Sequence, residues 1–457
     1  MTDSILIVGG GFAGLTAAIE CASTGAHAIV VERDAIVGGR LAAAMTKDSS
    51  VGDNVHGVTI PKLSMLADAE NIEIFTLSDL QSIDGRPGNL GIEIRERARF
   101  VTDACTLCNH CRPVCPVVRP NEHDAGLSYR KAIYAPLAES LPQEFVIDIE
   151  SCLNAPPNYL PCNRCTEVCD DDAIHFDVDL VKLHQRQVGA VVLAVGFTTQ
   201  DGAPHHGYGT HPDVVTAAEM ERLLTAPGPT GGFAAKPSNE DYPNSVLFIV
   251  DDPTPFAVHT AASQIERLIA QDVSKITLLV TNQPGNDLRA ALLQQLPRGL
   301  TVNYGLVQKV EARADNKVTV TYADFSSSRI PEEQYDMVVL SSAVSPATSL
   351  DELAKVIDCE LARTGYIATP DAADPHATSR PGVYLAGGPE GPTTLAETAE
   401  HAKAAAAAAL THIDARLLDS DALVPGRAAA TADAQPESAS DVQARIERAL
   451  FAMLESG

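Results

Sequence analysis

Short apolar runs that end in glycine or in a charged residue alternate with helical periodicity at the start of this chain. Residues 4–11 and 28–32 are such runs, and residues 12–24 between them carry apolar positions at helical spacing. Runs of this length are typical of buried strands, and the order strand, helix, strand indicates a βαβ unit.

A second region repeats this pattern. Buried strands are predicted at 245–250 and 275–280, with a helix at 255–270 between them. The apolar run Val188–Gly196 is expected to return to the first sheet. A last strand at 383–388 precedes a long alanine-rich helix, so an α/β protein with two βαβ regions is predicted.

Two other stretches differ in character. Residues 58–98 are mixed and contain the turn signals Asp84-Gly85 and Pro87-Gly88-Asn89. Residues 101–177 are rich in Cys, Pro and Asn and offer only short elements, which indicates a small inserted domain. Beyond a linker at 428–440, a final helix carries an apolar stripe, which we expect to dock on a partner or on its own domain: Val442, Ile446, Leu450 and Leu454.

Composition narrows the classes of protein. A chain of 457 residues is too long for one compact core. Its formal charge of −27 repels phosphate backbones, so nucleic-acid binding is not expected. No apolar run is long enough to cross a bilayer, and no secretory leader is predicted, so a cytoplasmic protein is expected.

A glycine motif follows the first strand. Gly9, Gly11 and Gly14 fit the spacing G-x-G-x-x-G at the start of the predicted helix. The first glycine makes the turn, the second lets a pyrophosphate approach the backbone, and the third lets helix and strand pack closely. Glu32 ends the second strand, where an acid can accept the ribose hydroxyls. A dinucleotide site at the helix N-terminus is predicted.

Flanking residues favour FAD over NAD. Val37–Arg40 resembles the G-G-[RK] turn of flavoproteins with two dinucleotide-binding domains, as do the A-x-G turn Ala194–Gly196 and the closing Tyr384–Gly388. The motif and this resemblance predict that FAD is bound by Gly9, Gly11, Phe12, Ala13, Gly14, Glu32, Arg33, Gly39, Arg40, Ala194, Gly196, Gly387 and Gly388.

Eight of the ten cysteines lie close together, which indicates metal binding or catalysis rather than disulfides. The first four, ending in Cys115-Pro116, have the full spacing of bacterial ferredoxins, and the second four have a longer first gap. Structural zinc also uses C-x2-C pairs but rarely this run, so two [4Fe–4S] clusters are preferred. By the crossed rule of such ferredoxins, one cluster takes Cys105, Cys108, Cys111 and Cys169, and the other takes Cys115, Cys152, Cys162 and Cys165.

The segment between the two cysteine sets, Asn121–Pro136, resembles the A subunit of heterodisulfide reductase. The same holds for Phe145–Asp148 and for residues 207–209, 220–224 and 228–232. The opening and the length look closer still to the A subunit of the quinone-interacting membrane-bound oxidoreductase. The resemblance covers most of residues 1–410. It implies a thioredoxin-reductase-like FAD core with a two-cluster ferredoxin-like insert, working in a multisubunit electron-transfer complex.

The chain also departs from that family. Residues 49–57 and 250–264 lack the additional cysteines of many members, so a further cluster is not expected. The turn Asp251–Pro255 has two carboxylates and two prolines where a pyridine-nucleotide reductase places glycines. Because these residues repel a pyrophosphate and remove backbone donors, NAD(P)H is not expected to be the electron source.

The predicted function is an oxidoreductase that transfers electrons between partner subunits in sulfur or energy metabolism. The alternative is an NAD(P)H-dependent disulfide or quinone oxidoreductase. No catalytic dyad is visible, and the histidines at 205, 206 and 211 are expected to be solvated. The resemblance implies other redox subunits as partners, among them a membrane quinone-reactive subunit that could attach the chain to a membrane. A homodimer is a further option.

The expected domain organisation interleaves two nucleotide-binding folds with the insert. The FAD-binding domain comprises 1–98, part of 179–243, which also connects the two folds, and 344–415; the ferredoxin-like insert is 99–178, the degenerate second dinucleotide-like domain is 244–343, and the linker and C-terminal helix are 416–457.

Overall fold

A computed structural model of the chain describes most of residues 3–413. The described ranges are 3–42, 47–48, 53–137, 141–154, 160–199, 206–251, 254–281, 296–297, 300–312, 316–327, 329–341, 344–371, 373–387, 391 and 393–413. Several sequence predictions lie outside these ranges, among them Gly388 and the linker and helix at 416–457.

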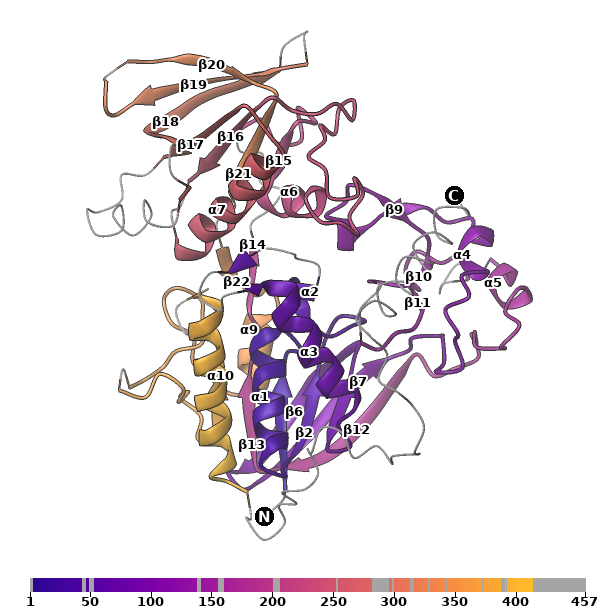
Figure 1. The fold of residues 1–457 in the computed structure, drawn as a ribbon. Helices are drawn as coiled ribbons and strands as arrows, with labels where there is room; N and C mark the ends of the chain where they lie inside the picture. The colour runs from indigo at the N-terminus through magenta and orange to yellow at the C-terminus, as the bar shows by residue number, and fades with distance from the viewer. Residues whose placement is uncertain are drawn as a thin grey trace, which may run out of the picture. The chain divides into compact units, whose positions relative to one another are not determined.

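A five-stranded parallel sheet forms the first core. Its order is β23 (Val383–Leu385), β13 (Ala190–Leu193), β1 (Ser4–Val8), β2 (His27–Val31) and β5 (Ile72–Phe75). Helices α1 (Phe12–Ser23) and α10 (Leu395–Leu410) lie side by side on one face (Figure 1). Small alanines in both helices, such as Ala18 and Ala405, allow this close packing.

An antiparallel sheet covers the opposite face. Its order is β12 (Val181–Val188), β7 (Asn89–Arg97) and β6 (Ser78–Arg86), and α9 (Leu350–Val356) packs beside it. The predicted turn at Pro87-Gly88 joins β6 and β7, and Gly88 has φ +84°. The turn predicted at Asp84-Gly85 is wrong, because Gly85 pairs with Leu90 inside the hairpin.

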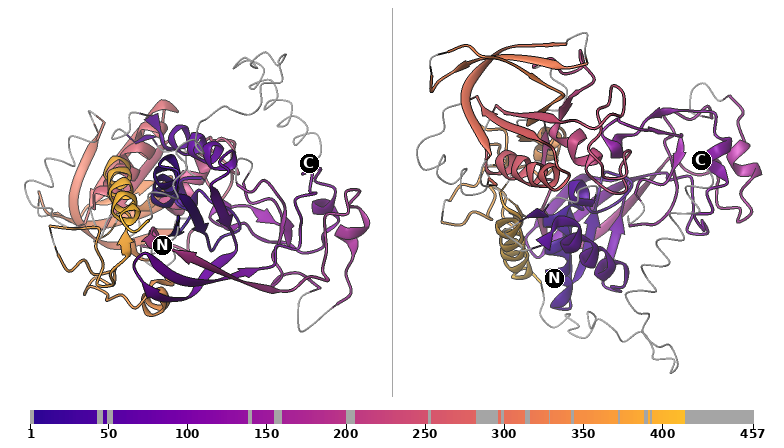
Figure 2. Two further views of the ribbon diagram at one scale, coloured as in Figure 1. Left: turned by 90° about the horizontal axis from the view of Figure 1, so that it is seen from below. Right: turned by 45° about the horizontal axis from the view of Figure 1, so that its top comes forward.

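The Cys-rich segment leaves and returns through one strand pair. Two long strands lead to it and back in Figure 2. The segment begins after β7 and ends before β12, and Arg97 pairs with Val181 in the antiparallel register. As the sequence predicts, its elements are short: α4 (Cys111–Val114), β8 (Arg119–Pro120), the 3-10 helix η1 (Glu122–Asp124), β9 (Tyr129–Arg130), β10 (Ile133–Tyr134), β11 (Val146–Ile147) and α5 (Arg164–Glu167).

The second βαβ region builds a seven-stranded sheet in the order β15 (Val214–Thr216), β21 (Met337–Ser341), β16 (Ser245–Val250), β17 (Lys275–Val280), β18 (Thr301–Ala312), β19 (Val318–Asp324) and β20 (Glu332–Tyr335). The first five strands are parallel and the last pairs are antiparallel. Helices α6 (Ala217–Leu223) and α7 (Pro255–Ala270) pack on one face through Met220 and Ile265.

Small elements complete the described chain: α2 (Gly39–Ala42), β3 (Lys47–Asp48), β4 (Asp53–Asn54), α3 (Val55–Ala67), β14 (Phe197–Thr199) and β22 (Val344–Pro346). The predicted α/β class with two βαβ regions is confirmed. None of the helices in the described ranges is long and apolar enough to span a bilayer.

Candidate functional site

A cavity of about 750 Å³ opens where the parallel strands of the first sheet end. Residues just after the carboxyl ends of β1, β2, β13 and β23 line it, which is where open α/β sheets bind ligands. Among the residues predicted to bind FAD, all line this cavity except Gly14 and Gly388, and Gly388 lies outside the described residues.

The three motif glycines have different surroundings. Gly9 has φ +106°, and a Cβ on it would lie 2.4 Å from the carbonyl oxygen of Ala194. A Cβ on Gly14 would lie 1.8 Å from the carbonyl oxygen of Gly9, so Gly14 lets α1 pack on β1. A Cβ on Gly11 would meet nothing within 4 Å. Gly11 therefore leaves open space where a ligand can approach the backbone at the start of α1.

Glu32 organises the turn opposite this helix start. Its carboxylate accepts hydrogen bonds from the backbone N–H groups of Gly10 at 2.6 Å and Asp34 at 2.8 Å. Burial raises the pKa of Glu32, whereas the two backbone donors act in the opposite direction. Two donors fix the carboxylate at the edge of the cavity, which suits an acceptor for ribose hydroxyls.

Arg40 lies on another wall of the cavity. Its guanidinium donates to the hydroxyl of Thr199 at 3.1 Å and lies 4.8 Å from the ring centre of Phe197. The Phe197 ring in turn contacts Phe256 of α7 edge-on, with ring centres 4.9 Å apart. Helix α7 of the seven-stranded sheet therefore contributes to the cavity wall through Phe256 and His259.

The prediction from sequence missed many cavity residues, and two groups of them come from parts of the chain that are distant from the glycine motif. Glu122, His123 and Ala125 come from the Cys-rich segment, and a second group comes from α6: Ala217, Ala218, Glu221 and Arg222. Nothing in their local pattern indicates a ligand site, because tertiary contacts alone bring them to the glycine motif. The resemblance of residues 121–136 and of parts of 207–232 to a known family was the available signal.

Two buried polar atoms in the cavity wall have no hydrogen-bond partner within the described part of the chain. They are Nε2 of His123 and the hydroxyl of Tyr366. Buried polar groups are rarely left without a partner in folded proteins. Together with the open space at Gly11, these atoms fit a bound polar ligand such as FAD, whose two halves carry many donors and acceptors.

The eight clustered cysteines line two separate small cavities. Cys105, Cys108, Cys111 and Cys169 line one, and Cys115, Cys152, Cys162 and Cys165 line the other. These are the same two sets that the crossed ferredoxin rule groups. Helices α4 and α5 begin around these cysteines. Six of the eight cysteines pack in the apolar cluster around Phe100 and Ile147, whereas Cys108 is exposed.

The sulfur atoms within each set influence one another. Burial, together with the smaller effect of the neighbouring sulfurs of Cys105 and Cys108, raises the pKa of Cys111 to about 12. Burial likewise raises the pKa of Cys165 to about 11, with Cys152 and Cys162 acting in the same direction. Among the described residues, no group of three or more His, Cys, Asp or Glu side chains could hold a single metal ion.

Asp251 and Thr254, on either side of the turn after β16, both form hydrogen bonds within the chain. The carboxylate of Asp251 forms a hydrogen bond with Nε2 of His206 at 3.0 Å, and the hydroxyl of Thr254 accepts from the backbone N–H of Ala257 at the start of α7. The prediction that the histidines at 205, 206 and 211 are solvated is wrong for two of them. His206 pairs with Asp251, and His211 is buried and accepts from the backbone N–H of Asp213. The third, at 205, lies outside the described residues.

Comparisons with known proteins agree with these features. The family model described as FAD dependent oxidoreductase matches residues 4–57. The chain is 32% identical over 436 residues to one of the iron–sulfur A subunits of the CoB–CoM heterodisulfide reductase of Methanopyrus kandleri, covering 91% of this chain and 65% of that protein. It is 30% identical over 430 residues to the corresponding iron–sulfur A subunit of Methanocaldococcus jannaschii, covering 89% of this chain and 63% of that protein.

The chain thus spans a little under two thirds of the length of these relatives. Among solved structures, it is similar to a thioredoxin reductase of Lactococcus lactis, with 12% identity, a TM-score of 0.49, and coverage of 90% of this chain and 98% of that chain. The resemblance indicated by residues 121–136 is confirmed: over about nine tenths of its length this chain is similar to heterodisulfide reductase A subunits.

Proposed function

We propose that this chain is an FAD- and iron–sulfur-containing oxidoreductase that transfers electrons between partner subunits of a redox complex in sulfur or energy metabolism. One observation supports the proposal above all. A cavity lined by a dinucleotide motif and two cavities lined by four cysteines each lie in one chain that is similar to heterodisulfide reductase A subunits.

The flavin would be held by the motif residues. Gly11 and the N-terminus of α1 would receive the pyrophosphate, and Glu32 would accept the ribose hydroxyls. Arg40 and Phe197 would form the wall on the side of α7. Apolar residues such as Phe12 and Leu385 would exclude water from the cavity. Bound there, FAD supplies an exchange between two-electron and one-electron steps, and the clusters supply one-electron transfer.

The cysteines would hold two [4Fe–4S] clusters in the crossed arrangement. Each cavity is lined by four cysteines, which matches the four thiolate ligands that such a cluster needs. We infer a ferredoxin-like insert at 99–178, since the paired ends of β7 and β12 flank it. The other domain boundaries predicted from the sequence are part of the same proposal.

The partner subunits belong to the proposal as well. The relatives named above are subunits of heterodisulfide reductases, so we infer that this chain works with other redox subunits. The two specific candidates are a second copy of this chain and a membrane quinone-reactive subunit. Affinity purification of the tagged chain from its own cells, without oxygen, should recover one of them.

Cofactor content tests the proposal. The chain purified without oxygen should contain about one FAD and eight irons, as two four-iron clusters require. Flavin and cluster absorbance, iron analysis and electron paramagnetic resonance of the reduced protein measure this. Stoichiometric zinc in place of iron would contradict the cluster assignment, and a protein that binds no FAD would contradict the flavin assignment.

A further inference from the structure

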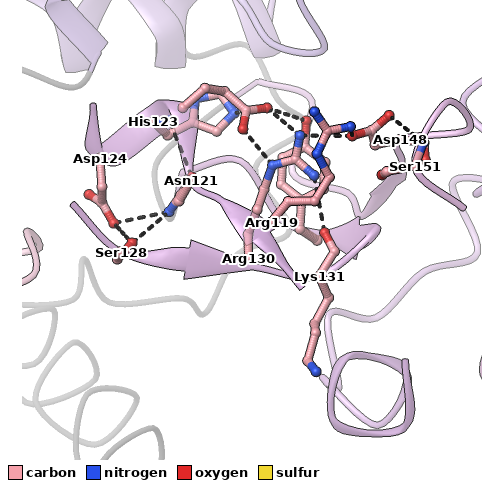
Figure 3. A network of polar contacts seen from close by, with 11 residues as sticks. Arg119, Asn121, His123, Asp124, Ser128, Arg130, Lys131, Asp148 and Ser151 are labelled. Atoms are coloured by element: carbon pink, nitrogen blue, oxygen red, sulfur yellow. Dashed lines mark hydrogen bonds and ion pairs between the residues drawn. The ribbon is translucent and has the colours of Figure 1, made fainter. Parts of the chain in front are cut away.

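The loop Asn121–Ser128 of the Cys-rich segment is fixed by its own hydrogen bonds. The side chain of Asn121 accepts from the backbone N–H of His123 at 3.1 Å and donates to Asp124 at 3.0 Å and to Ser128 at 3.2 Å. Figure 3 shows Asn121, Asp124 and Ser128 pointing toward one another. Ala125 adopts φ +51° and closes the turn after η1. The loop therefore has a defined shape without any ligand.

Two arginines hold this loop from opposite sides. Arg130, which is 8% exposed, donates to both carboxylate oxygens of Glu122, at 2.5 and 2.7 Å. It also donates to Asp148 at 3.0 Å (Figure 3). Arg222 of α6 donates to Asp124 at 2.9 and 3.0 Å, and this pair is also buried. The residue between Glu122 and Asp124 is His123, so its position is fixed on both sides.

His123 is the exception in this satisfied loop. Its side chain is 19% exposed, it lines the large cavity, and its buried Nε2 has no hydrogen-bond partner among the described residues. The closest carboxylate oxygen, on Glu122, is 4.0 Å away and is already bonded to Arg130. Burial lowers the pKa of His123, against the carboxylates of Glu122 and Asp34. A neutral imidazole can donate or accept at Nε2.

The place of His123 in the cavity indicates which part of a ligand it meets. Asp34, which follows Glu32 after the end of β2, lines the same cavity as His123, and its carboxylate acts on the pKa of the imidazole. In dinucleotide-binding folds this strand end receives the adenosine ribose. The adenosine half of FAD carries hydroxyls and ring nitrogens that can bond an imidazole.

We propose that His123 binds the adenosine half of FAD through Nε2, so that the Cys-rich insert supplies a ligand to the flavin site. The inference rests on the proposed function, because it requires FAD in the large cavity. It adds a link that the glycine motif does not provide. FAD retention then depends on the fold of the insert. The insert contacts the flavin through the loop Asn121–Ser128, in which the other polar side chains already form hydrogen bonds within the protein.

The test measures FAD affinity rather than activity. Flavin-stripped, iron-loaded protein is titrated with FAD, followed by flavin fluorescence, and with ADP in competition. His123→Phe should raise the dissociation constants for FAD and ADP about tenfold, since a buried bond is lost. His123→Gln, which keeps a polar atom at similar reach, should recover most of the affinity. Tyr129→Phe, which alters an exposed residue of the same hairpin, is the matched control.

The outcomes separate the inference from the proposed function. A change below twofold in the FAD dissociation constant of His123→Phe overturns the inference while leaving the flavin site intact. Weaker FAD binding with unchanged ADP binding overturns the adenosine assignment. Wild-type protein that binds no FAD overturns the proposed function instead. If His123→Phe loses its iron, the test uses nitrogen-15 histidine spectra of the wild-type protein instead. The His123 resonance is the one that is missing in H123Q. Addition of FAD should shift that resonance, and an unshifted resonance overturns the inference.

Discussion

Gly11 and Gly14 belong to one motif and serve different purposes, and this difference can be measured at the scale of single residues. Gly14→Ala places a methyl group against the carbonyl of Gly9, so we expect a loss of roughly 1–3 kcal/mol in the free energy of unfolding. Gly11→Ala places its methyl group in open space with φ −77°, which alanine adopts without strain.

The expected result for Gly11→Ala is therefore an unchanged melting temperature of the flavin-free protein with greatly weakened FAD binding. Thermal unfolding followed by circular dichroism and a FAD titration measure both quantities on both variants. Equal thermal stability of the two variants without flavin would contradict the distinction, as would normal FAD affinity in Gly11→Ala.

Glu32 should make the stability of the flavin-free protein depend on pH. Because burial raises its pKa in the folded state above the ordinary value near 4.5, the folded protein holds the proton more tightly than the unfolded chain does. The stabilising contribution is therefore fully present below pH 4.5 and is lost as the pH rises through the folded-state pKa. Relative to wild type, Glu32→Gln should gain stability over that rise, as urea unfolding at several pH values would measure. If the difference in free energy of unfolding between Glu32→Gln and wild type stayed constant over this pH range, Glu32 would not be the source of the pH dependence.

At the scale of elements, a buried ion pair connects the insert to α6. Arg222 and Asp124 are 6% and 13% exposed, so removing one partner leaves a buried charge unpaired. Arg222→Met is expected to lower the free energy of unfolding by about 3–5 kcal/mol. Lys403→Met breaks the exposed pair with Glu400 and should cost less than about 0.5 kcal/mol. Urea unfolding of both variants measures the difference. Similar losses in the two variants would show that the Arg222 pair does not have this role.

The sequence predicted helices and strands correctly where hydrophobic periodicity or a local signal determines their bounds. The strands at 245–250 and 275–280 and the helix at 255–270 have the predicted bounds. The turn at Asp84-Gly85 failed, because pairing with β7 outweighed a local glycine preference. The prediction that His206 and His211 are solvated failed for a related reason. The partner of His206 is Asp251, which only tertiary structure brings near, and the partner of His211 is the backbone N–H of Asp213 in a local turn.

At the scale of the whole molecule, the glycine motif could be found from sequence, but the wall that faces it could not. Residues of one cavity come from the first sheet, from the insert and from α6 and α7. Spacing along the chain identifies Gly9, Gly11 and Gly14 because their mutual arrangement is local. His123 and Phe256 reach the cavity through tertiary packing of segments that are far apart in the sequence, and no periodicity encodes that packing.

The turn after β16 in the second sheet leads to a prediction about whether NADH or NADPH can reduce the flavin. A domain that binds a pyridine nucleotide presents glycines and free backbone donors at the turn after its first strand. Here the turn after β16 begins with Asp251, paired with His206, and Thr254 occupies a backbone donor at the start of α7. The carboxylate repels a pyrophosphate, and the cap competes with it for the helix N-terminus. NADH and NADPH are therefore expected not to reduce the flavin rapidly.

Stopped-flow absorbance under anaerobic conditions measures this directly on the flavin-loaded chain. Dithionite is the control, because it should bleach the flavin whether or not a nucleotide site exists. Asp251→Gly with Thr254→Gly tests the cause, since it removes the carboxylate and the cap together, and any gain in NADPH affinity would identify them as the barrier. Rapid bleaching of the wild-type flavin by NADH or NADPH would favour the alternative function, an NAD(P)H-dependent reductase, because the second sheet would then bind the nucleotide despite Asp251.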